Sequence, residues 1–123
     1  MYDEEIVLDL LGKMAELTER IRARFKEVVS VSELTDSCAG VEKLDLLLMP
    51  LIVIGELVTK IDHITKQALF EKYPQIPWRE IKGLRNVVAH NYYEVNAEEI
   101  FDTCKNDIPK LAETIKQIIS DFQ

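Results

Sequence analysis

Residues 85–92 bring together side chains that could act on a phosphodiester without a metal. The segment reads Arg-Asn-Val-Val-Ala-His-Asn-Tyr, and its His90 is one of only two histidines in the chain. Arg85 comes before His90, and Tyr92 comes after it. An imidazole can move a proton near neutral pH, and a guanidinium can hold phosphate oxygens in a fork. Metal binding, redox work and acyl transfer need other residue types.

A helix through this segment would gather its polar groups on one edge. At 3.6 residues per turn, Arg85 and Tyr92 would share a stripe, and Asn86 and His90 would share the adjacent one. His90 would lie near the helix C-terminus, where the dipole favours its charged form. The opposite side would face the core through Ile81, Leu84, Val87 and Val88.

RNA is the phosphodiester that such an edge would suit, because RNA carries its own nucleophile in the 2′-hydroxyl. Cleavage needs a base for that proton, an acid for the leaving 5′-oxygen, and positive charge near the phosphorus. Histidine can be the base or the acid, arginine can bind the phosphate, and Asn86 can orient the phosphate or the imidazole. One chain supplies only one motif histidine for two proton transfers.

The spacing of Arg85, His90 and Tyr92, with Asn86 directly after the arginine, resembles the Arg-x4-His-x-Tyr motif of HEPN domains. The nearest likeness is to the toxin-type branch, HepT, which is paired with MntA-type minimal nucleotidyltransferases. The resemblance extends roughly from residue 44 to residue 119. Segments outside the motif that also fit are Ile54-Gly55-Glu56, Trp78-Arg79-Glu80-Ile81, Gly83-Leu84 and Lys105-Asn106-Asp107-Ile108-Pro109-Lys110-Leu111.

This resemblance implies a four- or five-helix bundle, paired as a homodimer with two motifs across one cleft. It implies a metal-independent endoribonuclease toxin with catalytic Arg85, His90 and Asn86, leaving 2′,3′-cyclic phosphate and 5′-hydroxyl ends. The implied partner is a nucleotidyltransferase antitoxin that attaches AMP to the motif tyrosine, Tyr92. The AMP would block the groove and compete for Arg85. No cofactor and no metal are implied.

Two other functions fit the same residues. Some HEPN relatives accompany a nucleotidyltransferase and help it hold substrate or nucleotide without cleaving RNA, and the acidic charge and small size of this chain suit that role. A plain dimeric scaffold would leave the polar edge unexplained. Without the family resemblance, Arg85 would be interpreted as a surface arginine, His90 as a helix-end histidine and Tyr92 as a packing residue.

Charged residues outside the motif have simpler interpretations. His63 is expected to be a solvated or hydrogen-bonded helix residue. Glu56 is buried by pattern and would pair with a cation or a backbone group. Trp78 is expected to anchor the core. The cations Lys60, Lys66, Lys72 and Arg79 could help to bind phosphate, although scattered cations on helices are usually solvated.

Composition and charge limit these possibilities. The 123 residues are 47% hydrophobic and 30% charged, which suits one domain with a real core, taken as residues 1–123. No apolar run reaches the ~18 residues of a membrane span, the acidic start is unlike a signal peptide, and Cys38 and Cys104 suggest buried thiols in a reducing cytoplasm. The net charge of −7 opposes diffuse RNA binding, so positive potential must be local or concentrated by a dimer.

Helical periodicity dominates the chain and predicts an all-α antiparallel bundle. The first helix is expected over 4–29 with Asp3 as its cap, and the second, central helix over 41–73 with a kink at Pro50. The third is expected to run from Trp78 to Tyr92 or Tyr93. The last element begins after the cap Asn96, is interrupted by Pro109, and is expected to restart with Asp107 as a cap.

Overall fold

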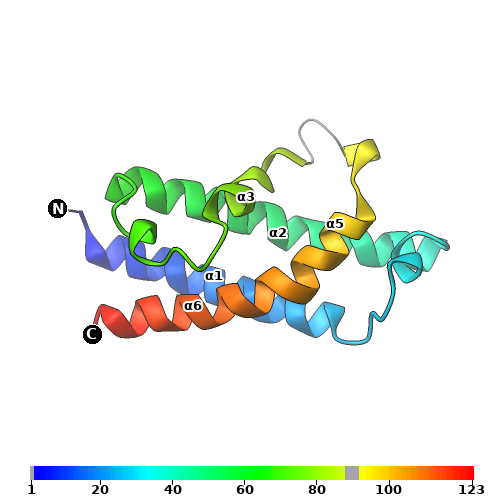
Figure 1. The fold of residues 1–123 in the computed structure, drawn as a ribbon, viewed down its shortest axis with the longest axis horizontal. Helices are drawn as coiled ribbons and strands as arrows, with labels where there is room; N and C mark the ends of the chain where they lie inside the picture. Colours follow the sequence, from blue (N-terminus) through cyan, green and yellow to red (C-terminus); the bar gives the residue numbers. More distant parts are fainter. Residues whose placement is uncertain (1, 88–91) are drawn as a thin grey trace.

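The computed structural model describes residues 2–87 and 92–123, and their regular structure is helical (Figure 1). No strand occurs within these two ranges, so the prediction of an all-α fold is confirmed. The α-helices are α1 (Glu4–Phe25), α2 (Cys38–Thr65), α3 (Trp78–Gly83), α5 (Ala97–Asp102) and α6 (Ile108–Asp121). Short 3₁₀ turns lie at Val31–Leu34, Phe70–Lys72 and Tyr92–Glu94, and a π-helical turn spans Thr103–Asp107.

The first helix begins where its capping residue predicts. One carboxylate oxygen of Asp3 accepts hydrogen bonds from the backbone N–H groups of Glu5, at 3.0 Å, and Ile6, at 3.2 Å. These bonds satisfy two donors that have no partner within the helix. α1 ends at Phe25, a few residues before the predicted end at 29. The residues between α1 and α2 form a connection that includes the 3₁₀ turn Val31–Leu34.

The central helix is shifted relative to its prediction of 41–73. The Ser37 hydroxyl accepts from the N–H of Gly40 at 3.0 Å, so α2 begins at Cys38. It ends at Thr65 because Lys66 and Gln67 adopt left-handed φ values of 53° and 66°. Pro50 is buried inside the helix, as the sequence predicts.

The expected third helix, from Trp78 to Tyr92 or Tyr93, is wrong in its extent. α3 ends at Gly83, the residue with the lowest helix propensity in this segment. Beyond it, the N–H of Leu84 donates to the Ile81 carbonyl at 3.2 Å, and the N–H of Arg85 donates to the Lys82 carbonyl at 3.4 Å. These bonds span three residues instead of four, so the backbone tightens just before the motif.

The segment from Asn96 to the end of α6 agrees with most of the predictions made for it. The Asn96 side chain accepts from the N–H groups of Glu98, at 3.0 Å, and Glu99, at 3.2 Å, as its predicted role as a cap requires. α6 begins at Ile108, with Pro109 in its first turn. Asp107 precedes it but makes no capping hydrogen bond, so that prediction is wrong. Instead, the π-helical turn joins α5 to α6 directly.

The core lies where α1, α2 and α6 meet. α1 packs against both α2 and α6, and it runs antiparallel to each of them (Figure 1). α3 packs on the C-terminal half of α2, about midway along the bundle (Figure 1). No helix of the described ranges is long and apolar enough to span a bilayer. Fully buried side chains at this meeting point include Leu11, Met14, Leu47, Leu51, Ile54, Ile61, Ile108, Leu111 and Ile115.

The two cysteines differ from each other. Cys104 is buried as predicted, and burial raises the pKa of its thiol to about 12. Cys38 is exposed at the start of α2, so the expectation of a buried thiol is wrong there. Cys38 is the first residue of α2, and its side chain is open to solvent there.

Candidate active site

The backbone of Arg85 lies directly against α2 at Gly55. A Cβ atom added to Gly55 would be 2.9 Å from the Arg85 nitrogen, 2.9 Å from the Ile81 carbonyl oxygen and 3.2 Å from the Lys82 carbonyl oxygen. All three are backbone atoms, which cannot rotate away as a flexible side chain can. Glycine at position 55 therefore lets the end of α3 approach α2 closely enough to place Arg85 at the surface beside it.

The Arg85 side chain reaches Glu56, the residue after Gly55. One guanidinium nitrogen lies 3.8 Å from a Glu56 carboxylate oxygen, and the two side chains are 40% and 61% exposed. The sequence correctly suggested a cation as the partner of Glu56, but its expected burial is wrong. An exposed pair of this kind contributes only ~0–1 kcal/mol to folding. Its consequence is positional, because Glu56 orients the guanidinium on the open face of α2.

Tyr92 is fixed to the same helix at a different point. It opens the 3₁₀ turn Tyr92–Glu94, and its hydroxyl donates to a carboxylate oxygen of Asp45 at 2.7 Å. This hydrogen bond, with lesser contributions from desolvation and negative charge, raises the pKa of the Tyr92 phenol. The side chain remains 39% exposed, so a reagent approaching from solvent can reach it.

These two contacts place Arg85 and Tyr92 at different points along α2. Asp45 and Glu56 are separated by 11 residues of α2, which corresponds to about 16 Å of helical rise. Eleven residues also bring the helix to within about 20° of the same direction, so both carboxylates share one face. The expected uninterrupted helix through Arg85 and Tyr92 does not form, because α3 ends at Gly83 and Tyr92 lies in a 3₁₀ turn. Residues 88–91 of the expected stripe lie outside the described residues.

The other predicted catalytic residues are placed less completely. Asn86 is exposed and helical, directly after the turn that holds Arg85. His90 lies outside the described residues. His63 is exposed in the last turn of α2, in accord with its prediction as a solvated residue.

An exposed apolar stripe on α2 occupies the space between the two anchored carboxylates. Leu46, Met49 and Val53 are 50%, 62% and 37% exposed, at helical spacing on the side of Asp45 and Glu56. Surface-exposed large apolar side chains that cluster beside polar groups often mark an interface. We call these three residues the α2 stripe.

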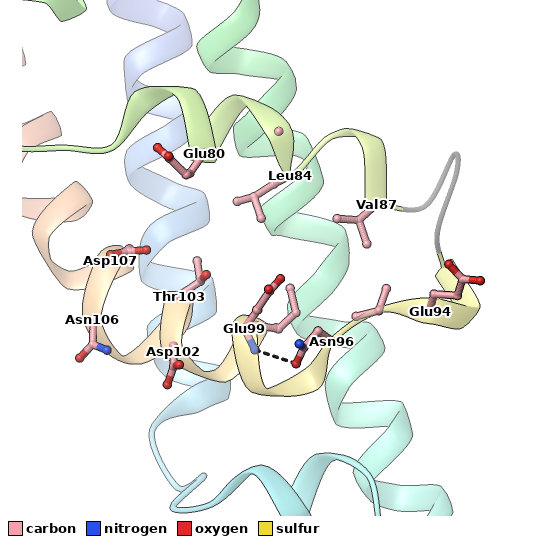
Figure 2. A pocket seen from close by; sticks show the side chains of 13 residues that line it. Glu80, Leu84, Val87, Glu94, Asn96, Glu99, Asp102, Thr103, Asn106 and Asp107 are labelled. Atoms are coloured by element: carbon pink, nitrogen blue, oxygen red, sulfur yellow. Dashed lines mark hydrogen bonds between the residues drawn. The ribbon is translucent and has the colours of Figure 1, made fainter.

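The far side of the motif segment borders an acidic cavity of about 800 Å³ (Figure 2). Leu84 and Val87 line it on one side of the motif, and Glu94 lines it on the other. No lysine or arginine occurs among the described residues of the lining. A phosphate group would be repelled by this lining, so the acidic cavity is unsuited to binding a polyanion. The carboxylates that line this cavity are Glu80, Glu94, Glu99, Asp102 and Asp107.

One of these carboxyl groups, that of Asp107, has a raised pKa. Burial raises the pKa of Asp107, and the nearby charges of Glu80 and Asp102 raise it further. Lys110 acts in the opposite direction and lowers it. This carboxyl group thus carries its negative charge less readily than a free aspartate does.

The sequence did not reveal the roles of Gly55 and Asp45, which position Arg85 and Tyr92. Gly55 lies within a segment that fits the family pattern, but its role requires knowing that α3 crosses α2 at that position. Asp45 carries no local signal at all, since its partner Tyr92 lies 47 residues away. Within residues 2–87 and 92–123, no three His, Cys, Asp or Glu side chains are grouped as a metal site would need.

Comparison with known proteins places the chain in a family. The family described as "Ribonuclease HepT-like" matches residues 10–118. The relative named "Probable ribonuclease HepT" of Thermococcus cleftensis is 30% identical over 103 residues, covering 84% of this chain and 86% of the relative. No solved structure matches the chain.

Shorter matches agree with this one. "Putative RNase MJ0125" of Methanocaldococcus jannaschii is 37% identical over 71 residues, and "Putative RNase TTE0752" of Caldanaerobacter subterraneus is 35% identical over 67 residues. These matches cover 58% and 54% of this chain, and 58% and 56% of the two relatives, so the chain spans little more than half of their length. Because the family pattern extends over residues 10–118, this chain belongs to the HepT-like family of HEPN domains.

Proposed function

We propose that residues 1–123 act as one HEPN domain with metal-independent endoribonuclease activity, as the toxin of a two-gene toxin–antitoxin module. The observation that carries the proposal is the placement of Arg85, the first residue of the motif, against Gly55 on an open face of the bundle. The names of the relatives support RNA as the substrate. The proposed location is the cytoplasm, where RNA and a nucleotidyltransferase partner are available.

The proposed reaction transfers a phosphoryl group of the RNA from the 5′-oxygen of one nucleotide to the 2′-oxygen of the preceding nucleotide. His90 of one chain removes the proton of the 2′-hydroxyl, and the 2′-oxygen attacks the adjacent phosphorus. Arg85 binds the non-bridging oxygens as negative charge develops on them. The bond to the 5′-oxygen breaks, and a second His90 supplies the proton to that oxygen. The products are a 2′,3′-cyclic phosphate and a 5′-hydroxyl, and Asn86 orients the reacting phosphate.

RNA cleavage by the purified protein is expected to continue in excess EDTA, because no step above uses a metal ion. Denaturing gels should show discrete fragments from a structured RNA. The 3′ ends should carry cyclic phosphate, detected by resistance to direct adapter ligation and by mass. Activity that appears only after Mg²⁺ or Mn²⁺ is added, or fragments with 5′-phosphate ends, would contradict the mechanism.

The homodimer is part of the same proposal, because the attacking 2′-oxygen and the leaving 5′-oxygen of an in-line displacement lie on opposite sides of the phosphorus, where two imidazoles can serve them separately. A two-fold axis through the α2 stripe would bring two copies of Leu46, Met49 and Val53 together. It would also bring the two Glu56–Arg85 pairs toward one cleft, since they lie on the same face of α2. Burying side chains of this size contributes ~1.5–3 kcal/mol each.

Met49→Glu is expected to convert the dimer to a monomer and to lower RNA cleavage at least ten-fold. The side chain is 62% exposed, so the fold of one chain tolerates the charge while an apolar interface does not. Sedimentation velocity at micromolar concentration measures the association. Val29→Glu, at a 78% exposed position after α1, is the matched control and should leave both properties unchanged. A Met49→Glu variant that remains a fully active dimer would refute this interface.

We propose further that the partner is a minimal nucleotidyltransferase and that it silences the toxin by transferring AMP to Tyr92. The phenol oxygen would bond to the α-phosphate of ATP, pyrophosphate would leave, and the proton would pass to a base. Asp45 is positioned to take that proton, at 2.7 Å from the hydroxyl. The product adds an anion and considerable bulk to the α2 face that has to admit RNA.

Co-expression with the adjacent nucleotidyltransferase is expected to add one or more AMP units to Tyr92, with loss of RNA cleavage. Intact-mass and peptide mass spectrometry measure the increment and its position. Tyr92→Phe should abolish it, whereas Tyr93→Phe, at a 98% exposed position next to it, should not. AMP on Tyr93 or Tyr73, or neutralisation with no change in mass, would show that the assignment is wrong.

A further inference from the structure

A second cavity, of about 590 Å³, lies between the end of α2 and the start of α3. Phe70 and Trp78 form one wall. Two cations from α3, Arg79 and Lys82, and two carboxylates, Asp62 and Glu71, also line the cavity. This combination of aromatic and cationic groups differs from the acidic cavity on the other side of the motif. Stacking surfaces beside cations are the usual means of holding single-stranded nucleic acid.

The aromatic wall is rigid. The rings of Phe70 and Trp78 are stacked, with centroids 3.9 Å apart and an interplanar angle of 17°. The indole N–H of Trp78 donates to the Tyr73 carbonyl at 2.8 Å, which fixes the ring in its plane. Phe70 is buried while Trp78 is half-buried, so the indole is the ring available to a ligand. A ring that is already fixed loses little conformational entropy when a base stacks on it.

Positive charge is concentrated in this part of an acidic chain. Residues 57–85 contain six of the 15 lysines and arginines but only three of the 22 aspartates and glutamates, which gives the segment a net charge of +3. The whole chain has a net charge of −7. RNA binding requires a locally positive potential, and residues 57–85 are the candidate source of it. The residues that line this cavity lie within this segment. The six cations are Lys60, Lys66, Lys72, Arg79, Lys82 and Arg85.

The cavity also lies next to the motif. Lys82 bonds to Asp62 on α2 at 2.8 Å, and Arg85 pairs with Glu56, six residues earlier on the same helix. Six residues correspond to about 9 Å of helical rise. Arg79, Lys82 and Arg85 follow one another at intervals of three residues, which places neighbouring side chains along one edge of a helical segment. This edge leads from the aromatic wall to the proposed cleavage site.

We propose that this cavity is a binding subsite for one nucleotide of the RNA strand, adjacent to the phosphate held by Arg85. Its base stacks on Trp78, and its phosphate binds Arg79 and Lys82. Asp62 holds the Lys82 ammonium in place from the opposite side. The choice of RNA as the ligand rests on the proposed ribonuclease function. In this proposal the residues of the subsite bind the RNA and take no part in the cleavage reaction.

The sole tryptophan of the chain reports directly on this subsite. A 2′-O-methyl oligoribonucleotide cannot be cleaved, because it lacks the free 2′-hydroxyl. Titrating it into the full chain should quench Trp78 fluorescence to saturation. Arg79→Glu should weaken the affinity at least ten-fold and reduce its dependence on salt. Arg79 is exposed, so its replacement leaves the core intact.

Lys116→Glu is the control with the same change of charge. Lys116 is exposed on α6, two residues from Thr114, which receives a hydrogen bond from Gln75 at 3.5 Å. Two residues turn the helix by about 200°, so Lys116 faces away from the loop that carries the aromatic wall. This variant should bind the oligonucleotide within two-fold of the original chain. On cleavable RNA, Arg79→Glu should raise KM with kcat unchanged.

Three results would overturn the subsite. One is binding of a labelled oligonucleotide, measured by anisotropy, with no quenching of Trp78. Another is an equal loss of affinity in Arg79→Glu and Lys116→Glu. The third is saturable quenching by a free mononucleotide with none by the oligonucleotide, which would identify a site for free nucleotides. Quenching that depends on Arg79 in a chain that cleaves no RNA would support the subsite and refute the proposed ribonuclease activity.

Discussion

Arg85→Ala is expected to lower kcat for RNA cleavage about 100- to 1,000-fold, the usual effect of removing one group that stabilises a developing negative charge. His90→Ala should have an effect of about 100- to 10,000-fold, the range for loss of a general acid or base. The fold should survive the first change, because Arg85 makes only an exposed ion pair at 3.8 Å. The free energy of unfolding should therefore change by less than ~1 kcal/mol.

Arg20→Ala is the matched control for this result. Arg20 is also an exposed arginine, and it pairs with Glu16 at 3.1 Å on α1. Its replacement should leave both cleavage and stability unchanged. Cleavage is followed with a short labelled RNA in EDTA, and folding with circular dichroism. If Arg85→Ala cleaved RNA as fast as Arg20→Ala, Arg85 would be an ordinary surface residue and the proposed mechanism would be wrong.

Gly55→Ala is expected to impair both stability and activity through a single added methyl group. Its Cβ would lie 2.9 Å from the Arg85 nitrogen and from the Ile81 carbonyl oxygen, closer than real Cβ atoms approach such groups. The end of α3 must therefore move away from α2. Overpacking of this kind costs ~1–3 kcal/mol, as urea unfolding at fixed protein concentration would measure.

The displacement in Gly55→Ala would fall on the backbone of Arg85 itself. A shift of about 1 Å in a group that positions the reaction can cost about 100-fold in rate. Gly12→Ala, in α1, is the internal comparison, because an added Cβ there meets nothing within 4 Å. That change should stabilise the protein by ~0.5–1 kcal/mol, since alanine favours a helix over glycine. Full activity in Gly55→Ala would show that the close approach does not position Arg85.

Local sequence signals predicted the elements whose determinants are themselves local. The caps at Asp3 and Asn96 form hydrogen bonds within three residues, and both were identified correctly. The apolar period of 3.6 indicated the helical class and the central position of α2, because a helix buried on several sides is apolar on several sides. The motif residues were also identifiable, since their side-chain chemistry and spacing are written in the chain.

Helix boundaries near the motif depended on contacts that periodicity does not contain. The sequence continues to look helical past Gly83, yet the chain tightens into three-residue hydrogen bonds at residues 84 and 85, and this turn ends α3. The same limit explains Glu56. Its position in an apolar run suggested burial, but α3 covers only part of that face of α2 and leaves Glu56 open to solvent and to Arg85.

By itself, the sequence determined that this protein is a helical bundle of the HepT-like family, and it predicted which side chains carry the proposed chemistry. Only the tertiary structure decided where those side chains lie. It set Arg85 against Gly55 and Tyr92 against Asp45, on one face of α2. It also separated an acidic cavity from an aromatic and cationic one. The physical reason is that both partners of each contact come from distant parts of the chain, so packing and not local propensity brings them together.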